Sequence, residues 1–234
     1  MSVQLAQATL EDMHEMQTVV FAAYSDYPFA RLMVPEIGTE SIDIIEKGIQ
    51  SATERSIRLW KASSTEYWIK IVDSETGTIV GVSRWQIYKD SPFENGAPHV
   101  EAEWYPVGSR IREYCTYLMN HRLKRQANRC NLPNIWLNMI CTHPKYRRRG
   151  VAALMMQWGV TQADELELEM FVEASSDGTH LYRNFGFVEV EELSTPRPEG
   201  ELDEEWKKLE EDYPFEATWM WRPKQKMQSK YCLE

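Results

Sequence analysis

With 234 residues and a hydrophobic fraction of 43 %, the chain is long enough for one domain with a substantial buried core. Its formal net charge of -10 argues against general nucleic-acid binding, which needs a basic surface, and is compatible with a cationic small substrate such as an amine. No stretch approaches the roughly 18 to 20 apolar residues of a membrane-spanning helix, so we expect no membrane partner.

The cysteines and the N-terminus bear on location. Four cysteines occur, none in a C-x-x-C pair or beside a histidine cluster, so the sequence predicts neither a disulfide framework nor a metal site. The first residues lack the basic and apolar segments of a signal peptide, so we expect a cytoplasmic protein. Short basic runs at Lys124–Arg125 and 224–230 leave a nuclear location open, although such matches often arise by chance.

The chain opens with a strand followed by a helix. Apolar and polar residues alternate over 3–8, which predicts a half-buried strand. Thr9 and Asp12 form a variant of the capping box, and apolar residues at helical spacing then predict a helix to about Tyr24. Pro28 and Pro35 predict a loop.

A second helix, a hairpin and a third helix follow. Isoleucines at helical spacing predict a helix over about 40–55, and residues 67–72 and 78–88 predict two strands joined by a turn rich in turn-forming residues. Prolines and glycines predict a loop over 89–108, and a helix is expected from about 109 to 129.

The next segment alternates strands and helices more regularly. Residues 135–141 are almost continuously apolar, which is typical of a central strand covered on both faces. A helix is predicted over 151–163, a strand over 168–173, a short helix over 177–184 and a strand over 187–191.

The end of the chain is more polar. Residues 194–214 predict a surface excursion in which a helical turn is possible, and 215–221 predict a last strand. A basic tail is expected over 224–234. Strands and helices mix without a linker or repeat, so the fold class we predict is a single α/β (α+β) domain.

A basic turn lies where the strand 135–141 gives way to the helix 151–163, with the pattern R-x-x-G-x-A at Arg147, Gly150 and Ala152. The first helical turn offers unpaired N–H groups and the positive end of the helix dipole, which together favour an anion. Gly150 lets the main chain approach a bulky anion, and the run of arginines adds positive charge. A pyrophosphate fits this turn, although neither a P-loop nor a G-x-G-x-x-G fingerprint is present.

This turn and the segment 181–187, LYRNFGF, resemble the GNAT superfamily of N-acetyltransferases. The turn matches the family's acetyl-CoA signature [Q/R]-x-x-G-x-[G/A], the lead-in His143–Tyr146 is similar to the family's, and LYRNFGF is close to its Y-x-x-x-G-F element. The resemblance covers about residues 135–190 and implies an acetyl-CoA-binding core there. It implies one N-acetyltransferase domain over 1–223, with a mixed, mostly antiparallel sheet flanked by helices.

In that family the amides of this turn bind the pyrophosphate of acetyl-CoA, and the preceding strand pairs with its pantetheine arm. A strand N–H also stabilises the oxyanion that forms from the thioester. The resemblance carries these roles over to Met139, Ile140, Cys141, Arg147, Arg148, Arg149, Gly150, Val151 and Ala152. Arginine at 147 and alanine at 152 are departures from the commoner residues that the family tolerates.

The resemblance also implies Tyr182 as the acid that protonates the departing thiolate, with plain aromatic packing as the alternative. No motif identifies a base; Glu173, at a strand end next to the expected cofactor, is our candidate, ahead of His99, Glu101 and Glu103. Aromatic side chains are candidates for lining an acceptor pocket, although core packing explains most such residues. They are Tyr24, Tyr27, Phe29, Trp85 and Trp104.

The expected activity is therefore transfer of an acetyl group from acetyl-CoA to a primary amine by direct attack on the thioester. The acceptor is either a small molecule or a protein amine, and the sequence does not distinguish them. The alternative is a non-catalytic module that binds acyl-CoA or a partner protein. No feature of the sequence predicts an oligomeric state.

Overall fold

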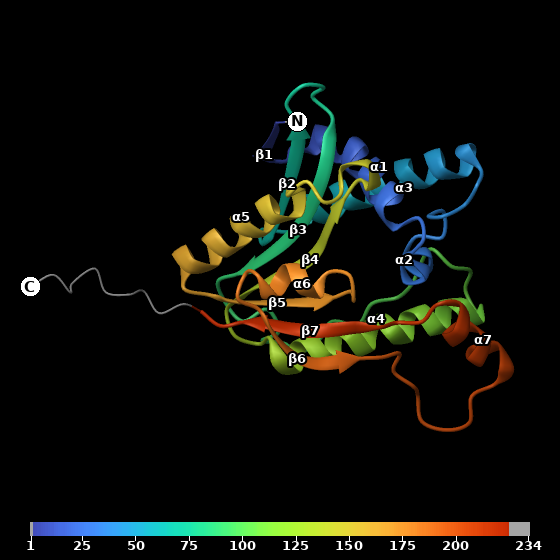
Figure 1. Ribbon diagram of the computed structural model, residues 1–234. Helices are drawn as coiled ribbons and strands as arrows, with labels where there is room; N and C mark the ends of the chain where they lie inside the picture. Colours follow the sequence, from blue (N-terminus) through green and yellow to red (C-terminus); the bar gives the residue numbers. More distant parts are fainter. Residues whose placement is uncertain (1, 225–234) are drawn as a thin grey trace, which may run out of the picture.

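The computed structural model describes residues 2–224, which form a seven-stranded sheet with helices on both faces (Figure 1). The strand order is β1-β2-β3-β4-β5-β7-β6. Strands β4 and β5 pair in parallel and every other neighbouring pair is antiparallel. This confirms the mixed, mostly antiparallel sheet that we predicted. The predicted basic tail lies outside the described residues except for Lys224.

The elements follow the predicted order. The strands are β1 (Val3–Gln7), β2 (Glu66–Asp73), β3 (Ile79–Tyr88), β4 (Asn134–Thr142), β5 (Glu169–Ala174), β6 (Val188–Leu193) and β7 (Ala217–Arg222). The helices are α1 (Met13–Tyr24), α2 (Pro28–Met33), α3 (Ile42–Ala62), α4 (Arg110–Arg129), α5 (Val151–Leu166), α6 (Thr179–Arg183) and α7 (Glu204–Asp212), with short 3-10 helices η1 (Leu10–Asp12) and η2 (Pro144–Tyr146). Within residues 2–224, no helix is both long and apolar enough to cross a bilayer.

One short helix lies where we predicted a loop, and another lies in the surface excursion for which we left a helical turn open. Helix α2 starts at Pro28, where a missing N–H costs nothing, and buries Leu32 completely. Helix α7 lies in the polar excursion; Asp203 caps it by accepting from the Trp206 N–H (2.8 Å), and the Trp206 ring packs edge-on against Tyr114. One buried side chain fixes each helix, and a short segment carries too little periodicity to show this in the sequence.

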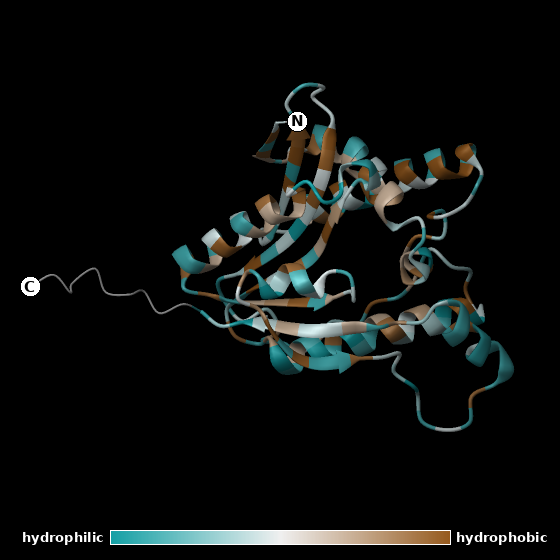
Figure 2. Cartoon of the chain, viewed as in Figure 1, coloured by the Kyte–Doolittle hydropathy of each residue, from teal (hydrophilic) through white to brown (hydrophobic). Residues whose placement is uncertain are grey.

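The two faces of the sheet carry different helices. Because strand residues alternate sides, Ile69 and Leu137 pack under α5, whereas Trp68 packs under α1. Helix α4 covers Trp219 on the same face as α1, with Arg129 stacked over that ring. Figure 2 shows apolar residues concentrated on β2 and β3 and polar residues on α7, the pattern of a sheet buried between helices.

Asp12 stabilises the N-terminus of α1. Its carboxylate accepts the Thr9 N–H (2.7 Å) in a capping box and pairs with the Lys70 ammonium on β2 (2.6 Å). Burial alone would raise the pKa of Asp12, but the hydrogen bonds from Lys70 and Thr9 outweigh it and lower the pKa below its usual value. The ionised carboxylate therefore stabilises the folded state.

We expect Asp12→Asn to lower the free energy of unfolding by about 1–2 kcal/mol at pH 7, because the neutral amide loses the charge-assisted hydrogen bonds from Thr9 and Lys70. Because the folded-state pKa is lowered, this stabilisation is present above the unfolded-state pKa and is lost as the pH falls through the folded-state pKa. Urea denaturation of both proteins at pH 7 and at pH 3 measures the difference. An equal difference at both pH values would contradict a role for the charge.

Candidate functional site

Strands β4 and β5 pair only over their first residues. The last parallel pair is Leu137 with Val172, yet β4 continues to Thr142 and β5 to Ala174. A bulge lies at the same point, since Trp85 of β3 opposes Leu137 while Arg84 opposes Met139, so Asn138 has no opposing residue in the β3–β4 register. A bulge bends and twists a strand. The structure therefore parts β4 from β5 directly after Leu137.

The predicted residues Met139, Ile140 and Cys141 lie on the part of β4 beyond this bulge, where β5 no longer pairs with it. Such an edge can pair with an extended ligand as if with another strand. The hydroxyl of Tyr24, at the end of α1, donates to the Ile140 carbonyl (3.3 Å). Tyr24 was one of the aromatic residues that we expected at the acceptor side, and it lies against this edge.

Beyond β4 the chain enters the basic turn and then α5. Arg148 (φ 60°) and Gly150 (φ 80°) both adopt the left-handed conformation, and Gly150 is the residue that caps α5. A Cβ built on Gly150 would meet no atom within 4 Å, so the space beside its main chain is open. The first turn of α5 contains no acidic side chain. The N–H groups there are thus accessible to an anion and face no competing carboxylate from their own helix.

Packing fixes where this turn lies. A Cβ on Gly81 of β3 would come within 2.4 Å of the Val151 side chain, so a glycine there lets the start of α5 lie close against the sheet. Val151 is buried in the main core. Arg147 donates through Nη2 to the Ala23 carbonyl (2.9 Å), and Arg149 stacks over the Tyr146 ring. The turn is therefore anchored to β3 and to the end of α1.

Tyr182 lies on α6, on the α5 face of the sheet. Its ring packs against Phe187 with centroids 5.8 Å apart, and 5 % of the residue is exposed. Burial raises the pKa of Tyr182, so the phenol keeps its proton at neutral pH. Within residues 2–224 no group accepts that proton in a hydrogen bond. Tyr182 therefore has both the packing expected of a core aromatic residue and a phenolic proton that no other group in this part of the structure accepts.

The same region contains Tyr24. Its burial, followed by the charges of Cys141 and Tyr182, raises the pKa of Tyr24 well above the usual value. An electrostatic influence of this kind requires proximity. The structure thus brings together the end of α1, the free edge of β4 and α6. Apart from the aromatic residue at the end of the first helix, no pattern in the sequence predicts that these segments meet.

Glu173 is the first residue of β5 beyond its last pair with β4, and its side chain points to α4. One carboxylate oxygen accepts from Arg122 Nε and the other from Arg125 Nη1 (3.4 Å). The side chain is 3 % exposed. Both oxygens are engaged, so taking a proton from an amine would cost an ion pair. The sequence did not indicate these two arginines.

The remaining candidates lie elsewhere. Glu101 lies in the loop before α4, and a hydrogen bond from Arg112 lowers the Glu101 pKa. His99 lines a surface pocket together with residues of α4, among them Thr116 and Lys124. Of the other aromatic residues, Trp85 is completely buried in the core and the Trp104 N–H donates to the Leu32 carbonyl (3.2 Å). Neither tryptophan lies at the free edge of β4.

Comparison with known proteins bears on the family and the fold. Residues 111–189 match the family model of the acetyltransferase (GNAT) domain. No curated protein matches the chain. Among solved structures, the histone acetyltransferase HPA2 and related acetyltransferase from Corynebacterium glutamicum has a TM-score of 0.58 at 19 % identity, covering 97 % of this chain and 99 % of that one.

Two further structures share the fold. A mutant of agmatine N-acetyltransferase has a TM-score of 0.57 at 14 % identity, covering 94 % of this chain and 97 % of its own. The ribosomal-protein-S18-alanine N-acetyltransferase from Escherichia coli has a TM-score of 0.53 at 10 % identity, covering 99 % of this chain and 100 % of its own. At these identities the likeness is one of fold, and the acceptors named for these proteins differ from one another.

Proposed function

Because this chain carries a GNAT acetyltransferase domain, we propose that it transfers an acetyl group from acetyl-CoA to a primary amine. The observation that carries this proposal is the parting of β4 from β5 after Leu137, next to an open helix start at Gly150. One extended ligand with a pyrophosphate at one end and a flexible arm at the other fits both features.

We assign the pyrophosphate to the main-chain N–H groups of residues 148–152, where the left-handed Arg148 and Gly150 shape the turn. The arginine run adds charge that suits phosphates. The pantetheine arm then pairs along Met139–Cys141. Because the Tyr24 hydroxyl already donates to the Ile140 carbonyl, the arm either shares that acceptor or displaces the hydroxyl.

The chemistry requires a neutral amine. Its nitrogen attacks the thioester carbonyl, a C–N bond forms, and an N–H of the β4 edge stabilises the resulting oxyanion. The attacking nitrogen then gives up its extra proton to water, and the C–S bond breaks as the thiolate takes a proton from the Tyr182 phenol. The resulting phenolate is reprotonated from water, so the net products are the amide and free coenzyme A. Alkylammonium groups have a pKa near 10.4, so the amine must first lose a proton.

Glu173 is the base that the sequence predicts. Since both of its oxygens accept from arginines, we propose instead that Glu173 holds Arg122 and Arg125 in place, and that the amine loses its proton to water.

Two measurements test the proposed function. In a calorimetric titration we expect acetyl-CoA to bind, and in a thermal unfolding experiment its addition should raise the midpoint with concentration. In a thiol-release assay with a diverse set of primary amines, we expect at least one acceptor to release coenzyme A faster than hydrolysis does. Binding without turnover on any amine would instead favour the non-catalytic acyl-CoA-binding module. Absence of binding would refute both.

A further inference from the structure

Asn138 and Gln86 form a polar pair at the point where β4 parts from β5. The Asn138 Nδ2 atom donates to Gln86 Oε1 (2.8 Å). Asn138 is the bulge residue that directly follows Leu137, and Leu137 is the last residue of β4 that pairs with β5. The pair therefore stands at the start of the gap between these two strands.

The proposed function places the thioester beside this pair. The proposed pyrophosphate site, residues 148–152, follows the end of β4, so the pantetheine arm runs from Cys141 back toward Met139. The reactive end of the arm then lies next to Asn138, the residue before Met139. The Asn138 side chain is thus close to the nitrogen that attacks the thioester.

The pair lies on the face of the sheet that α1 and α4 cover. Gln86 opposes Trp136 in the ladder, and opposing residues of an antiparallel pair share a face. The Trp136 ring packs against Trp219, over which Arg129 of α4 stacks. Since Asn138 bonds to Gln86, its side chain lies on this face as well. An amine that approaches from the side of α4 therefore meets the amide pair.

Glu66 lies across from Gln86 on β2, and both oxygens of its carboxylate are engaged. The Oε1 atom accepts from Trp68 Nε1 (2.6 Å) and the Oε2 atom from Arg84 Nη2 (2.7 Å). The Glu66 side chain is 2 % exposed. A substrate amine that bound this carboxylate would have to break an ion pair inside the protein.

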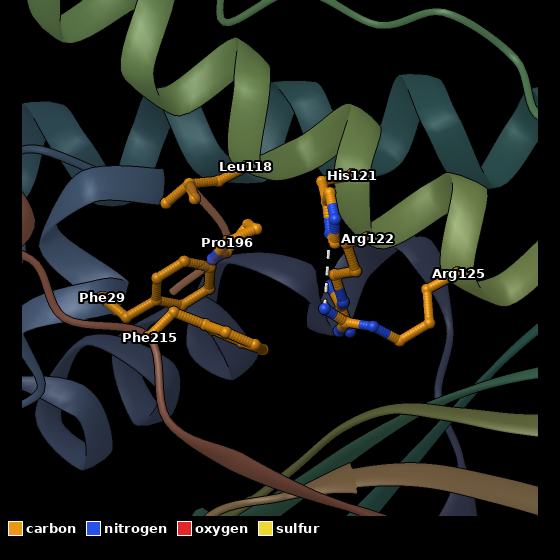
Figure 3. A pocket seen from close by; sticks show the side chains of 7 residues that line it. All are labelled: Phe29, Leu118, His121, Arg122, Arg125, Pro196 and Phe215. Carbon is orange, nitrogen blue, oxygen red and sulfur yellow. Dashed lines mark hydrogen bonds between the residues drawn. The ribbon is translucent and has the colours of Figure 1, made fainter. Parts of the chain in front are cut away.

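Glu173 is engaged in the same way on the other side of the gap. Arg122 and Arg125 project from α4 together with His121 (Figure 3), and both arginines pair with the Glu173 carboxylate. Both carboxylates that flank the amide pair are therefore occupied, which leaves the amide pair itself to hold an amine.

The amide pair has free hydrogen-bonding capacity. Both side chains are half-buried. Across residues 2–224, Asn138 Oδ1 accepts from no donor and Gln86 Nε2 donates to no acceptor, and neither atom is among the buried polar atoms that lack a partner. A ligand can therefore contact both atoms. One carbonyl oxygen and one NH2 group are thus offered to a substrate.

We propose that Asn138 binds the acceptor amine, with Asn138 Oδ1 accepting one N–H while the nitrogen lone pair faces the thioester carbonyl. This inference rests on the proposed function, which supplies the thioester. A neutral primary amine has two N–H groups and one lone pair, so it makes this contact and still attacks. A carboxylate in the same place would stabilise the ammonium form, which has no lone pair, whereas an amide oxygen carries no full charge. Gln86 is a positioning residue, because its hydrogen bond fixes the Asn138 amide.

Asn138→Ala tests the contact with the amine. For each amine that the thiol-release assay shows to be acetylated, we expect kcat/KM to fall by about tenfold or more, which corresponds to about 1.4 kcal/mol. Coenzyme A affinity and the slow hydrolysis of acetyl-CoA without amine should stay the same, because the amide contacts the amine and not the cofactor. An unchanged kcat/KM, or an equal fall in the hydrolysis rate, would overturn the inference.

Asn134→Ala is the matched control on the same strand. The Asn134 Nδ2 atom donates to the carbonyls of Cys130 (3.0 Å) and Leu132 (2.7 Å), in the part of β4 that still pairs with β5. Its loss should lower the thermal midpoint and leave kcat/KM for the amine unchanged. If Asn134→Ala slows acetylation as much as Asn138→Ala, the effect comes from the stability of β4 and the assignment is wrong.

Variants of Gln86 test the positioning role. Gln86→Met keeps the length of the side chain without its hydrogen bond, and should lower kcat/KM for the amine by about fivefold, the contribution of one neutral hydrogen bond. Gln86→Glu retains an oxygen that accepts from Asn138 Nδ2 and should recover most of this loss. In a protein that already carries Asn138→Ala, Gln86→Met should have no further effect. If the two losses multiply, or if Gln86→Glu is as slow as Gln86→Met, then Gln86 does not act through Asn138.

An NMR titration separates this inference from the proposed function. We add n-butylamine to isotope-labelled protein in the presence of coenzyme A, and identify the side-chain NH2 signal of Asn138 by its absence from Asn138→Ala. We expect that signal to shift while the Asn134 signal stays in place. A shift without turnover of any amine supports binding of the amine at Asn138, and only the proposed function then fails. No shift overturns the inference, whatever the thiol-release assay shows.

Discussion

Replacing Gly150 by valine is expected to weaken coenzyme A binding by about a hundredfold or more in a protein that still folds. The main chain at Gly150 is left-handed, and a Cβ built there would have no atom within 4 Å. A β-branched side chain fills that space and disfavours the backbone that aims the N–H groups. Each charge-assisted hydrogen bond contributes about 1.5–3 kcal/mol, so losing two of them weakens binding by about a hundredfold or more. Isothermal titration with coenzyme A measures the affinity.

The chain offers a matched control in Gly77, in the turn between β2 and β3. It has φ 74°, and a Cβ there would also meet no atom within 4 Å. The same left-handed strain applies, of about 1–2 kcal/mol, without a phosphate site. Gly77→Val should therefore lose similar stability and keep its affinity, and Gly150→Ala should fall between wild type and Gly150→Val. If Gly150→Val binds coenzyme A as tightly as Gly77→Val, the pyrophosphate does not lie on this turn.

The local part of the site was predictable because local sequence determines it. A buried strand, a glycine turn and an amphipathic helix follow one another within a short stretch, and the structure has β4, Gly150 and α5 in that order. Each of these depends on residues a few positions apart. The same holds for the hairpin of β2 and β3, where turn residues separate two strand patterns.

The parts that depend on distant residues were not predictable. The bulge at Asn138 exists only in the register against β3, and no residue of β4 indicates where β5 stops pairing. The contact of Tyr24 with Ile140 spans 116 positions, and that of Arg122 with Glu173 spans 51. The surroundings that make Glu173 a poor base are therefore a property of the tertiary fold. From the sequence alone, a carboxylate at a strand end appears free to act as a base, because the arginines of α4 that pair with Glu173 lie far away in the chain.

The two faces of the sheet suggest how the reactants meet. Tyr182 and the start of α5 lie on one face, whereas Glu173 and its arginines lie on the face of α4. The gap between β4 and β5 joins these faces. In the proposed reaction the thioester lies in this gap, with the amine approaching from the α4 face. The thiolate then leaves on the side where Tyr182 holds its proton.

Tyr182→Phe is expected to lower kcat by about 10²- to 10⁴-fold, the usual contribution of a general acid, while coenzyme A affinity stays the same. The ring that packs against Phe187 is retained, and the hydroxyl has no hydrogen-bond partner within residues 2–224, so the thermal midpoint should hardly change. Burial raises the pKa of Tyr182, so the acid stays protonated at neutral pH and the fall in wild-type rate at high pH lies above the ordinary value near 10. The variant should lack that fall. Steady-state kinetics across alkaline pH measures both effects.

Tyr24→Phe is the control that distinguishes an acid from a nearby phenol. It also removes a hydroxyl at this site, a partly buried one that donates to the Ile140 carbonyl. A neutral hydrogen bond contributes about 1 kcal/mol, so Tyr24→Phe should change kcat by roughly fivefold and keep the high-pH behaviour of the wild type. If Tyr182→Phe turns over at the wild-type rate while Tyr24→Phe is slowed a hundredfold, then the thiolate takes its proton from Tyr24 at the end of α1. In that case Tyr182 is only the packed aromatic of the core.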